Sequence, residues 1–284
     1  MWHPTNNTQL ILKKQSPWQE IALYKHGKDY WMSLNGILQF HTRECYVSHQ
    51  YMCRLPVMMA LNPRKALIIG GGDGFAAREL LKYPFIEEIT NVELDADLIK
   101  ITRDHPTMKS LTDGAFSDPR VKVIAGDGIG YLLNTQEKFD IIIDDCEYEY
   151  TGQGRNRKEL AEKKRYDDYR KCLVTKLTVG GVGNIMEPLI RVKPPKTDNV
   201  ISRVLAKGKY FFDLDGRMLD HKRYTQDELE KILVERQMNR ENDDLIFFKS
   251  ITPYVTYKIF MSKMIGPEAY IYFSNMPIEI RRTV

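Results

Sequence analysis

The sequence predicts an α/β protein with a Rossmann-like, doubly wound and mostly parallel sheet, preceded by a small N-terminal antiparallel β domain. Three observations predict this fold. Strand-like and helix-like segments alternate from residue 66 to 186, a glycine run follows the first buried strand, and short alternating segments precede residue 45. The 284 residues, of which 43% are hydrophobic and 28% charged, are enough to bury a substantial core.

The N-terminal segment predicts an antiparallel sheet. Apolar and polar residues alternate in short bursts between residues 9 and 40, and Asn35-Gly36 interrupts them. Asn-Gly between alternating runs is a strong hairpin signal. A helix is expected over Tyr46–Met59 and is expected to stop before Asn62-Pro63. We therefore divide the chain into a β-hairpin domain, residues 1–45, and a Rossmann-like domain, residues 46–284.

The Rossmann-like part is predicted from short apolar runs, which are typical of strands that are buried on both faces. Helix-forming segments separate these runs, as in parallel sheets. The expected strands are 66–69, 89–93, 121–124, 139–143 and 182–186, and the expected helices are 76–81, 96–103 and 166–177. An insertion is expected near 188–250, with a helix over 226–236, and a strand is expected over 251–263.

Composition excludes several classes of protein. The net charge of +4 is a small difference between 42 basic and 38 acidic residues, so no nucleic-acid partner is expected. No apolar run approaches the roughly 18 to 20 residues that span a bilayer, and the first ten residues lack a secretory pattern. Four cysteines without a Cys-x-x-Cys pair favour a reduced, cytoplasmic protein with no metal ligands. The basic run Arg191–Lys209 is interpreted as a solvated insertion, with contact to an acidic partner as the alternative.

A glycine loop is the first functional signal. Gly70-Gly71-Gly72-Asp73-Gly74 follows the first strand and opens a helix, which lets the backbone approach a ligand at the helix N-terminus. Glu93 follows Asp73 by 20 residues and ends the next strand, where an acid accepts hydrogen bonds from ribose hydroxyls. A tight turn beside a solvated carboxylate is the alternative interpretation.

The charge of the loop indicates which nucleotide is bound. Asp73 lies where a dinucleotide places its pyrophosphate, and a carboxylate there repels that group but attracts a sulfonium or an ammonium. Gly126-Asp127-Gly128 follows the third strand and offers a carboxylate to an adenine amino group. Three carboxylates at successive strand ends therefore favour a cationic adenosyl ligand over a nicotinamide dinucleotide.

Asp144-Asp145 ends the fourth strand, at the edge where open sheets place their sites. The loop that follows, Cys146 to Gly152, is dense in acidic and aromatic residues. An amine nucleophile needs such surroundings, because a carboxylate both holds the amine and removes its proton. The alternatives are a solvated acidic loop and, less favoured because no histidine is placed beside it, a nucleophilic Cys146.

These motifs resemble those of the spermidine synthases, the aminopropyltransferase family. The resemblance runs in order over roughly residues 18 to 185. It is found in six segments, Leu34–Gln39, Glu44–Gln50, Leu67–Gly74, Val92–Asp95, Asp118–Val121 and Gly126–Gly128. It implies a homodimer or homotetramer that transfers an aminopropyl group from decarboxylated S-adenosylmethionine to a small-molecule amine. Methylthioadenosine would be the product, and no tightly bound cofactor is implied.

The resemblance also implies roles for individual residues. Asp145 would orient and deprotonate the attacking amine, and Asp73 would hold the aminopropyl ammonium. His49 would be a polar donor-site residue, with a purely structural histidine as the alternative. The remaining donor-site residues would be Gln39, Gly70, Gly72, Gly74, Glu93, Asp127 and Gly128.

The acceptor half departs from the family pattern. Asp145-Cys146-Glu147-Tyr148-Glu149 replaces Asp-Ser-Ser-Asp-Pro, so the second aspartate is Tyr148. Ser48 stands where a tyrosine is usual, and Met186-Glu187-Pro188 replaces Gln-Gly-Glu. The expected acceptor-site residues are Glu147, Tyr148, Glu149, Glu187 and Tyr254, and putrescine is not assumed to be the acceptor.

Three functions remain open on the sequence. Aminopropyl transfer is the leading hypothesis, and an amine N-methyltransferase that uses S-adenosylmethionine is the second. Asp73 favours the first, because it would oppose the carboxylate of S-adenosylmethionine. A non-catalytic protein that binds nucleosides or polyamines is the third.

Overall fold

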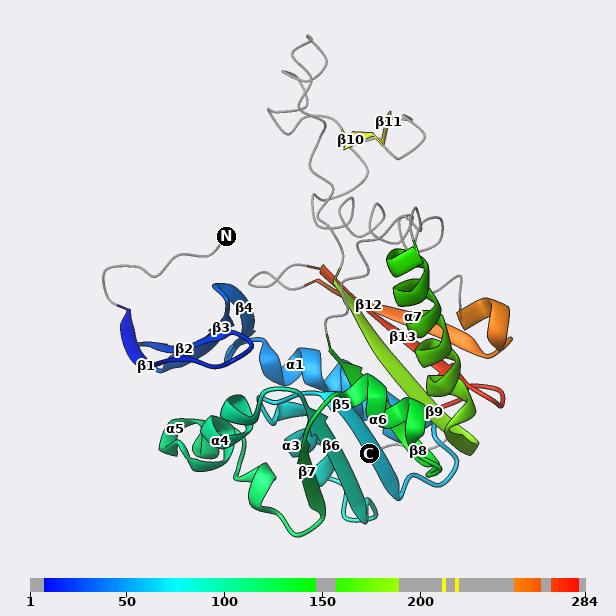
Figure 1. Ribbon diagram of the computed structural model, residues 1–284, viewed down its shortest axis with the longest axis horizontal. Helices are drawn as coiled ribbons and strands as arrows, with labels where there is room; N and C mark the ends of the chain where they lie inside the picture. Colours follow the sequence, from blue (N-terminus) through cyan, green and yellow to red (C-terminus); the bar gives the residue numbers. More distant parts are fainter. Residues whose placement is uncertain are drawn as a thin grey trace.

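The computed structural model describes residues 8–146, 157–188, 211–212, 218–219, 248–261 and 267–280. Within these residues lie a four-stranded sheet of order β1-β2-β3-β4 and a seven-stranded sheet of order β12-β13-β9-β8-β5-β6-β7. Figure 1 shows the small sheet to one side of the large one, with α1 between them. Most of the expected insertion at 188–250, including its helix, lies outside the described residues. Two short strands there, β10 (Phe211–Phe212) and β11 (Met218–Leu219), pair with each other.

The N-terminal sheet confirms the predicted antiparallel arrangement. Its strands are β1 (Gln9–Gln15), β2 (Glu20–His26), β3 (Asp29–Leu34) and β4 (Ile37–His41). Between β3 and β4, Asn35 and Gly36 have φ of 50° and 77°. This left-handed pair is the turn that matches the twist of a two-residue hairpin. The division of the chain into domains at residue 45 stays a prediction.

The segment predicted as one helix consists of three helical pieces. These are α1 (Cys45–His49), the π-helical η1 (Gln50–Arg54) and α2 (Leu55–Met59). The backbone stays in the right-handed helical region at both junctions, so the helical path is continuous. A π turn inserts one extra residue, which rotates the side chains on either side of it relative to a regular helix. The turn begins directly after His49.

The large sheet has the predicted parallel strands, extended by an antiparallel pair. The parallel strands are β5 (Lys65–Gly70), β6 (Glu88–Glu93), β7 (Val121–Ala125), β8 (Phe139–Asp145) and β9 (Leu177–Pro188). Antiparallel to β9 runs β13 (Pro267–Ser274), which was not predicted, and beyond it lies β12 (Val255–Met261). β9 is longer than predicted, because a register shift against β8 lets Gly180-Gly181 lie inside the strand.

Helices cover both faces of the large sheet. They are α3 (Phe75–Leu81), α4 (Ala96–Asp104), α5 (Pro106–Leu111), the 3₁₀ turn η2 (Ala115–Ser117), α6 (Gly128–Asn134) and α7 (Arg157–Thr175). In β5, Ala66 and Ile68 pack with α2 and α3, whereas Leu67 and Ile69 pack with α6 and α7. This alternation confirms the doubly wound fold. Among the described helices, none has the length and apolar character needed to cross a membrane.

The N-terminal sheet packs against the Rossmann-like part, and hydrogen bonds join the two next to the glycine loop. Apolar residues of β2, β3 and β4 share a core with Phe75, Leu98 and Met108. Asp95, which caps α4, also accepts hydrogen bonds from Ser16 Oγ at 2.6 Å and Gln19 Nε2 at 3.0 Å. This contact holds the small sheet, and the helical segment that follows it, beside the carboxyl ends of the parallel strands.

Candidate active site

The glycine loop and the end of β8 touch each other closely. Gly70 ends β5 with a φ of +78°, and a Cβ there would lie 2.3 Å from the carbonyl oxygen of Asp145. Only glycine satisfies both the left-handed backbone and this approach. The loop therefore lies directly against Asp145.

Glu93 and the loop form a second contact. The Oε2 atom of Glu93 accepts from the Gly72 amide at 3.1 Å, and its Oε1 accepts from the Asp95 amide at 2.8 Å. The Glu93 side chain is 9% exposed, and this burial raises its pKa, while the two amide hydrogen bonds oppose the rise. A carboxylate held by backbone amides is thus fixed at the end of β6, beside the loop.

Asp73 is held at the start of α3. Its Oδ1 accepts from the amide of Phe75 at 3.0 Å, and Gly74, with a φ of +82°, forms the turn into the helix. The second carboxylate oxygen of Asp73 takes no part in this hydrogen bond. The local sequence Asp-Gly-Phe thus sets the direction of the Asp73 side chain.

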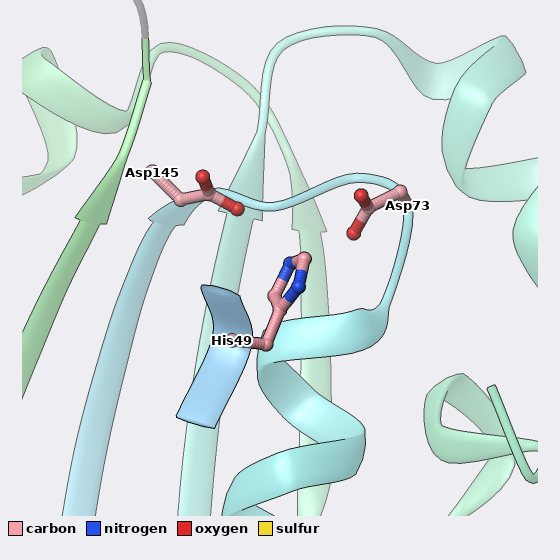
Figure 2. A group of neighbouring side chains, drawn as sticks. All are labelled: His49, Asp73 and Asp145. Carbon is pink, nitrogen blue, oxygen red and sulfur yellow. The ribbon is translucent and has the colours of Figure 1, made fainter. Parts of the chain in front are cut away.

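His49, Asp73 and Asp145 converge, as Figure 2 shows. One potential ligand atom from each residue lies within 4.8 Å of the other two. The His49 side chain is 6% exposed, its Nδ1 lies 2.7 Å from the carbonyl oxygen of Cys45, and its ring packs on Phe75. The predicted base and the predicted ammonium-binding carboxylate are therefore neighbours, and the histidine lies beneath both.

The predicted adenine side is more open. Asp127 precedes α6, its side chain is 52% exposed, and it forms an ion pair with Arg165 of α7. Gly128 packs closely on Ile69, where a Cβ would lie 2.6 Å from the Ile69 Cγ2. Gln39 lies on β4, and its Nε2 donates to the Ile37 carbonyl at 3.5 Å. The Arg165 contact had no signal in the sequence, because α7 comes from a later part of the chain.

The predicted acceptor residues are only partly described. Glu147, Tyr148 and Glu149 lie outside the described residues, and Glu187 is placed near the carboxyl end of β9, where it pairs with Ala269. Tyr254 is not brought to this edge. Its carbonyl accepts from the amide of Ser274, which pairs with Val182 near the amino ends of the parallel strands. The reason is that Tyr254 directly precedes β12, which is antiparallel to β13 and so runs in the same direction as β9.

A buried cluster behind Asp145 was also missed. Asp144 is buried and accepts from the Cys146 thiol at 2.9 Å, and the Tyr169 hydroxyl adjoins both groups. Burial and the Asp144 carboxylate raise the pKa of the Cys146 thiol, so this group is a poor nucleophile. The sequence offered the adjacent Asp144 as a signal but no indication of Tyr169.

The described geometry brings carboxylates from four strand ends to one edge. Asp73 follows β5, Glu93 ends β6, Asp127 follows β7 and Asp145 ends β8. In open α/β sheets this carboxyl edge is where ligands bind. The fold and the site thus define a Rossmann-like protein whose edge suits a cationic ligand.

Comparison with known proteins shows which proteins the chain resembles. Residues 45–182 match the spermine/spermidine synthase domain. The chain is 39% identical over 137 residues to polyamine aminopropyltransferase 2 of Aquifex aeolicus, and 33% identical over 183 residues to the polyamine aminopropyltransferase of Sodalis glossinidius. The first match covers 48% of this chain and 28% of the relative, and the second covers 64% and 59%.

Among solved structures, the fold is similar to that of the spermidine synthase from Thermotoga maritima. The TM-score is 0.63 at 20% sequence identity, and the match covers 94% of this chain and 72% of the other. The predicted Rossmann-like fold with its small N-terminal sheet is confirmed.

Proposed function

We propose that this chain is a polyamine aminopropyltransferase, which transfers the aminopropyl group of decarboxylated S-adenosylmethionine to a small-molecule amine. The observation that supports this most directly is the convergence of Asp73 and Asp145 at the carboxyl edge of the sheet. The spermine/spermidine synthase domain and the names of the relatives support the same reaction.

The donor half of the proposal rests on three carboxylates. Glu93 accepts from the ribose hydroxyls and Asp127 from the adenine amino group, with Gln39 beside the nucleoside. Asp73 then holds the aminopropyl ammonium, since its charge attracts a cation at the turn into α3. To reach the adenine, the Asp127 carboxylate has to share or exchange its contact with Arg165.

The transfer step follows from the position of Asp145. An acceptor amine bound by this carboxylate gives up a proton, and its lone pair attacks the aminopropyl carbon that is bonded to sulfur. The carbon–sulfur bond breaks with its electron pair on sulfur, so methylthioadenosine leaves as a neutral thioether. The new carbon–nitrogen bond leaves a secondary ammonium, and the proton that Asp145 took from the acceptor passes to solvent. No tightly bound cofactor takes part.

The acceptor is proposed to differ from putrescine, or to include other amines besides it. Tyr148 replaces the second aspartate of the family loop, and Glu147, Glu149 and Glu187 offer replacement charges. A longer or branched amine would use these charges and the neighbouring tyrosines.

The test is a mass-spectrometric screen of di-, tri- and tetraamines with each donor. We expect methylthioadenosine and an aminopropylated amine from decarboxylated S-adenosylmethionine. Asp145→Asn should lower turnover about 10²- to 10⁴-fold while methylthioadenosine binds within about threefold of the native protein. Asp104→Asn, an exposed carboxyl at the end of α4, serves as the control and should leave turnover unchanged.

Three results would overturn the proposal. The first is a lack of methylthioadenosine with every amine. The second is a methylated amine from S-adenosylmethionine, which would make the protein an N-methyltransferase. The third is an Asp145→Asn variant that turns over like the native protein, which would remove the base.

A homodimer or homotetramer in the cytoplasm completes the proposal. The N-terminal sheet exposes Leu10 and Ile37, and Trp18 next to it is also exposed, which suits a contact between copies. All four cysteines are free thiols, as in a reducing compartment. Light scattering of the purified chain tests the oligomer, and a monomer at micromolar concentration would contradict it.

A further inference from the structure

The tautomer that the neutral His49 ring adopts follows from its hydrogen bond. Its Nδ1 lies 2.7 Å from the Cys45 carbonyl oxygen, which only accepts, so the hydrogen of the neutral ring is on Nδ1. Nε2 then carries a lone pair. Within the described part of the chain, both hydrogen bonds of the ring involve Nδ1, and His49 as a residue is only 6% exposed.

The unpartnered edge of this ring faces two carboxylates. Figure 2 shows the imidazole pointing between Asp73 and Asp145, which come from the glycine loop and the end of β8. One ligand atom from each of the three residues lies within 4.8 Å of the others. Two carboxylates and an imidazole lone pair are all acceptors, and such a set is stabilised by a cation at its centre.

We propose that His49, Asp73 and Asp145 bind a divalent transition-metal ion. One imidazole nitrogen with two carboxylate oxygens suits Zn²⁺, Co²⁺ or Mn²⁺, whereas Mg²⁺ and Ca²⁺ prefer oxygen alone. The hydrogen bond from Nδ1 to a backbone carbonyl is the one that orients metal-binding histidines. This site departs from the expectation of no metal ligands, because the three residues lie far apart in the sequence and form no motif.

Metal binding requires the three ligand atoms to move closer together. Ligands of a tetrahedral zinc ion lie about 2.0 to 2.2 Å from the metal and hence roughly 3.4 Å from one another. His49 is fixed by its hydrogen bond and its packing on Phe75. The three ligand atoms lie within 4.8 Å of one another, so metal binding requires the oxygens of Asp73 and Asp145, which are partly exposed at a loop and a strand end, to move closer.

The metal site does not depend on the proposed function, but the two overlap. The proposed donor places its ammonium against Asp73, so a bound metal and the donor exclude each other. Metal binding is measured without any substrate. Failure of the metal proposal and failure of the transferase proposal are therefore separate results.

The test is titration of the full-length chain, free of a polyhistidine tag, with Co²⁺ followed by visible absorption and with Zn²⁺ by calorimetry. We expect one equivalent per chain, and at least tenfold weaker binding for His49→Ala. His26→Ala, at the end of β2, is the matched control and should bind like the native protein. Asp73→Asn, which keeps the size of the side chain, should also weaken binding at least tenfold.

Each alternative outcome decides against the proposal. Lack of one-equivalent binding by the native chain overturns it. Equal affinity in His49→Ala and His26→Ala assigns the metal to a surface site and also overturns it. If His49→Ala unfolds at the assay temperature, Asp73→Asn decides alone, and native affinity in that variant overturns the site.

Discussion

Replacing Gly72 by alanine tests whether the loop and Glu93 form one packed unit. A Cβ at Gly72 would lie 2.7 Å from the Cγ of Glu93 and 2.7 Å from the Cδ2 of Leu98. Carbon atoms in contact are about 3.5 to 4.0 Å apart, so the added methyl overlaps two neighbours by about 1 Å each. Both neighbours are buried and have little room to move. Overpacking of this kind costs about 1 to 3 kcal/mol of unfolding free energy.

Urea denaturation followed by circular dichroism measures this loss. Gly126→Ala is the matched control, because a Cβ there meets nothing within 4 Å. It should change the free energy of unfolding by less than about 0.5 kcal/mol or raise it slightly. The displaced Glu93 carboxylate should also weaken methylthioadenosine binding about 10- to 100-fold. Equal unfolding free energies for Gly72→Ala and Gly126→Ala would show that Gly72 is not packed tightly against Glu93 and Leu98.

Three further predictions concern contacts around the site. Asp95→Ala removes the cap of α4 and two bonds to the N-terminal sheet, so urea denaturation should show a loss of about 2 to 4 kcal/mol, against less than about 0.5 for exposed Asp104→Ala. Equal losses in Asp95→Ala and Asp104→Ala would contradict a role of Asp95 in holding the N-terminal sheet in place. Burial raises the pKa of Glu93, so the folded chain binds this proton more tightly than the unfolded one. Stability therefore falls as pH rises from 4.5, the ordinary value, through the folded pKa. In Glu93→Gln, the midpoint of urea unfolding should depend less on pH over this range. An unchanged pH dependence would contradict this prediction. Arg165→Ala releases the Asp127 carboxylate and should tighten methylthioadenosine binding about two- to fivefold by calorimetry, since exposed ion pairs contribute up to about 1 kcal/mol. Weaker binding would mean that Arg165 itself contacts the nucleoside.

The parallel strands and the carboxylates at their ends were predictable from the sequence. Each strand is a local apolar run, and each carboxylate follows its strand directly in the chain. Because parallel strands bring their carboxyl ends to one edge, Asp73, Glu93, Asp127 and Asp145 had to share that edge once the strand order was given. The Asn35-Gly36 hairpin was predictable for the same reason, since its signal is local.

Contacts between distant segments were not predictable. The π turn after His49 has no signature in residue type, yet it belongs to the helical segment that sets this histidine beneath the two carboxylates. Tyr254 lies away from the carboxyl edge because it precedes β12, whose direction depends on the pairing of β13 with both β12 and β9. The contact of Arg165 with Asp127 likewise depends on how α7 packs against α6.

The Rossmann-like sheet, the glycine loop and the carboxylates at its edge are specified locally, because these features follow from short-range periodicity and turn chemistry. Which side chains meet there depends instead on the tertiary structure. It brought His49 to Asp73 and Asp145, closed Gly70 against the Asp145 backbone and buried Asp144 behind them. These contacts arise from packing and strand register between distant segments, which residue order alone does not specify.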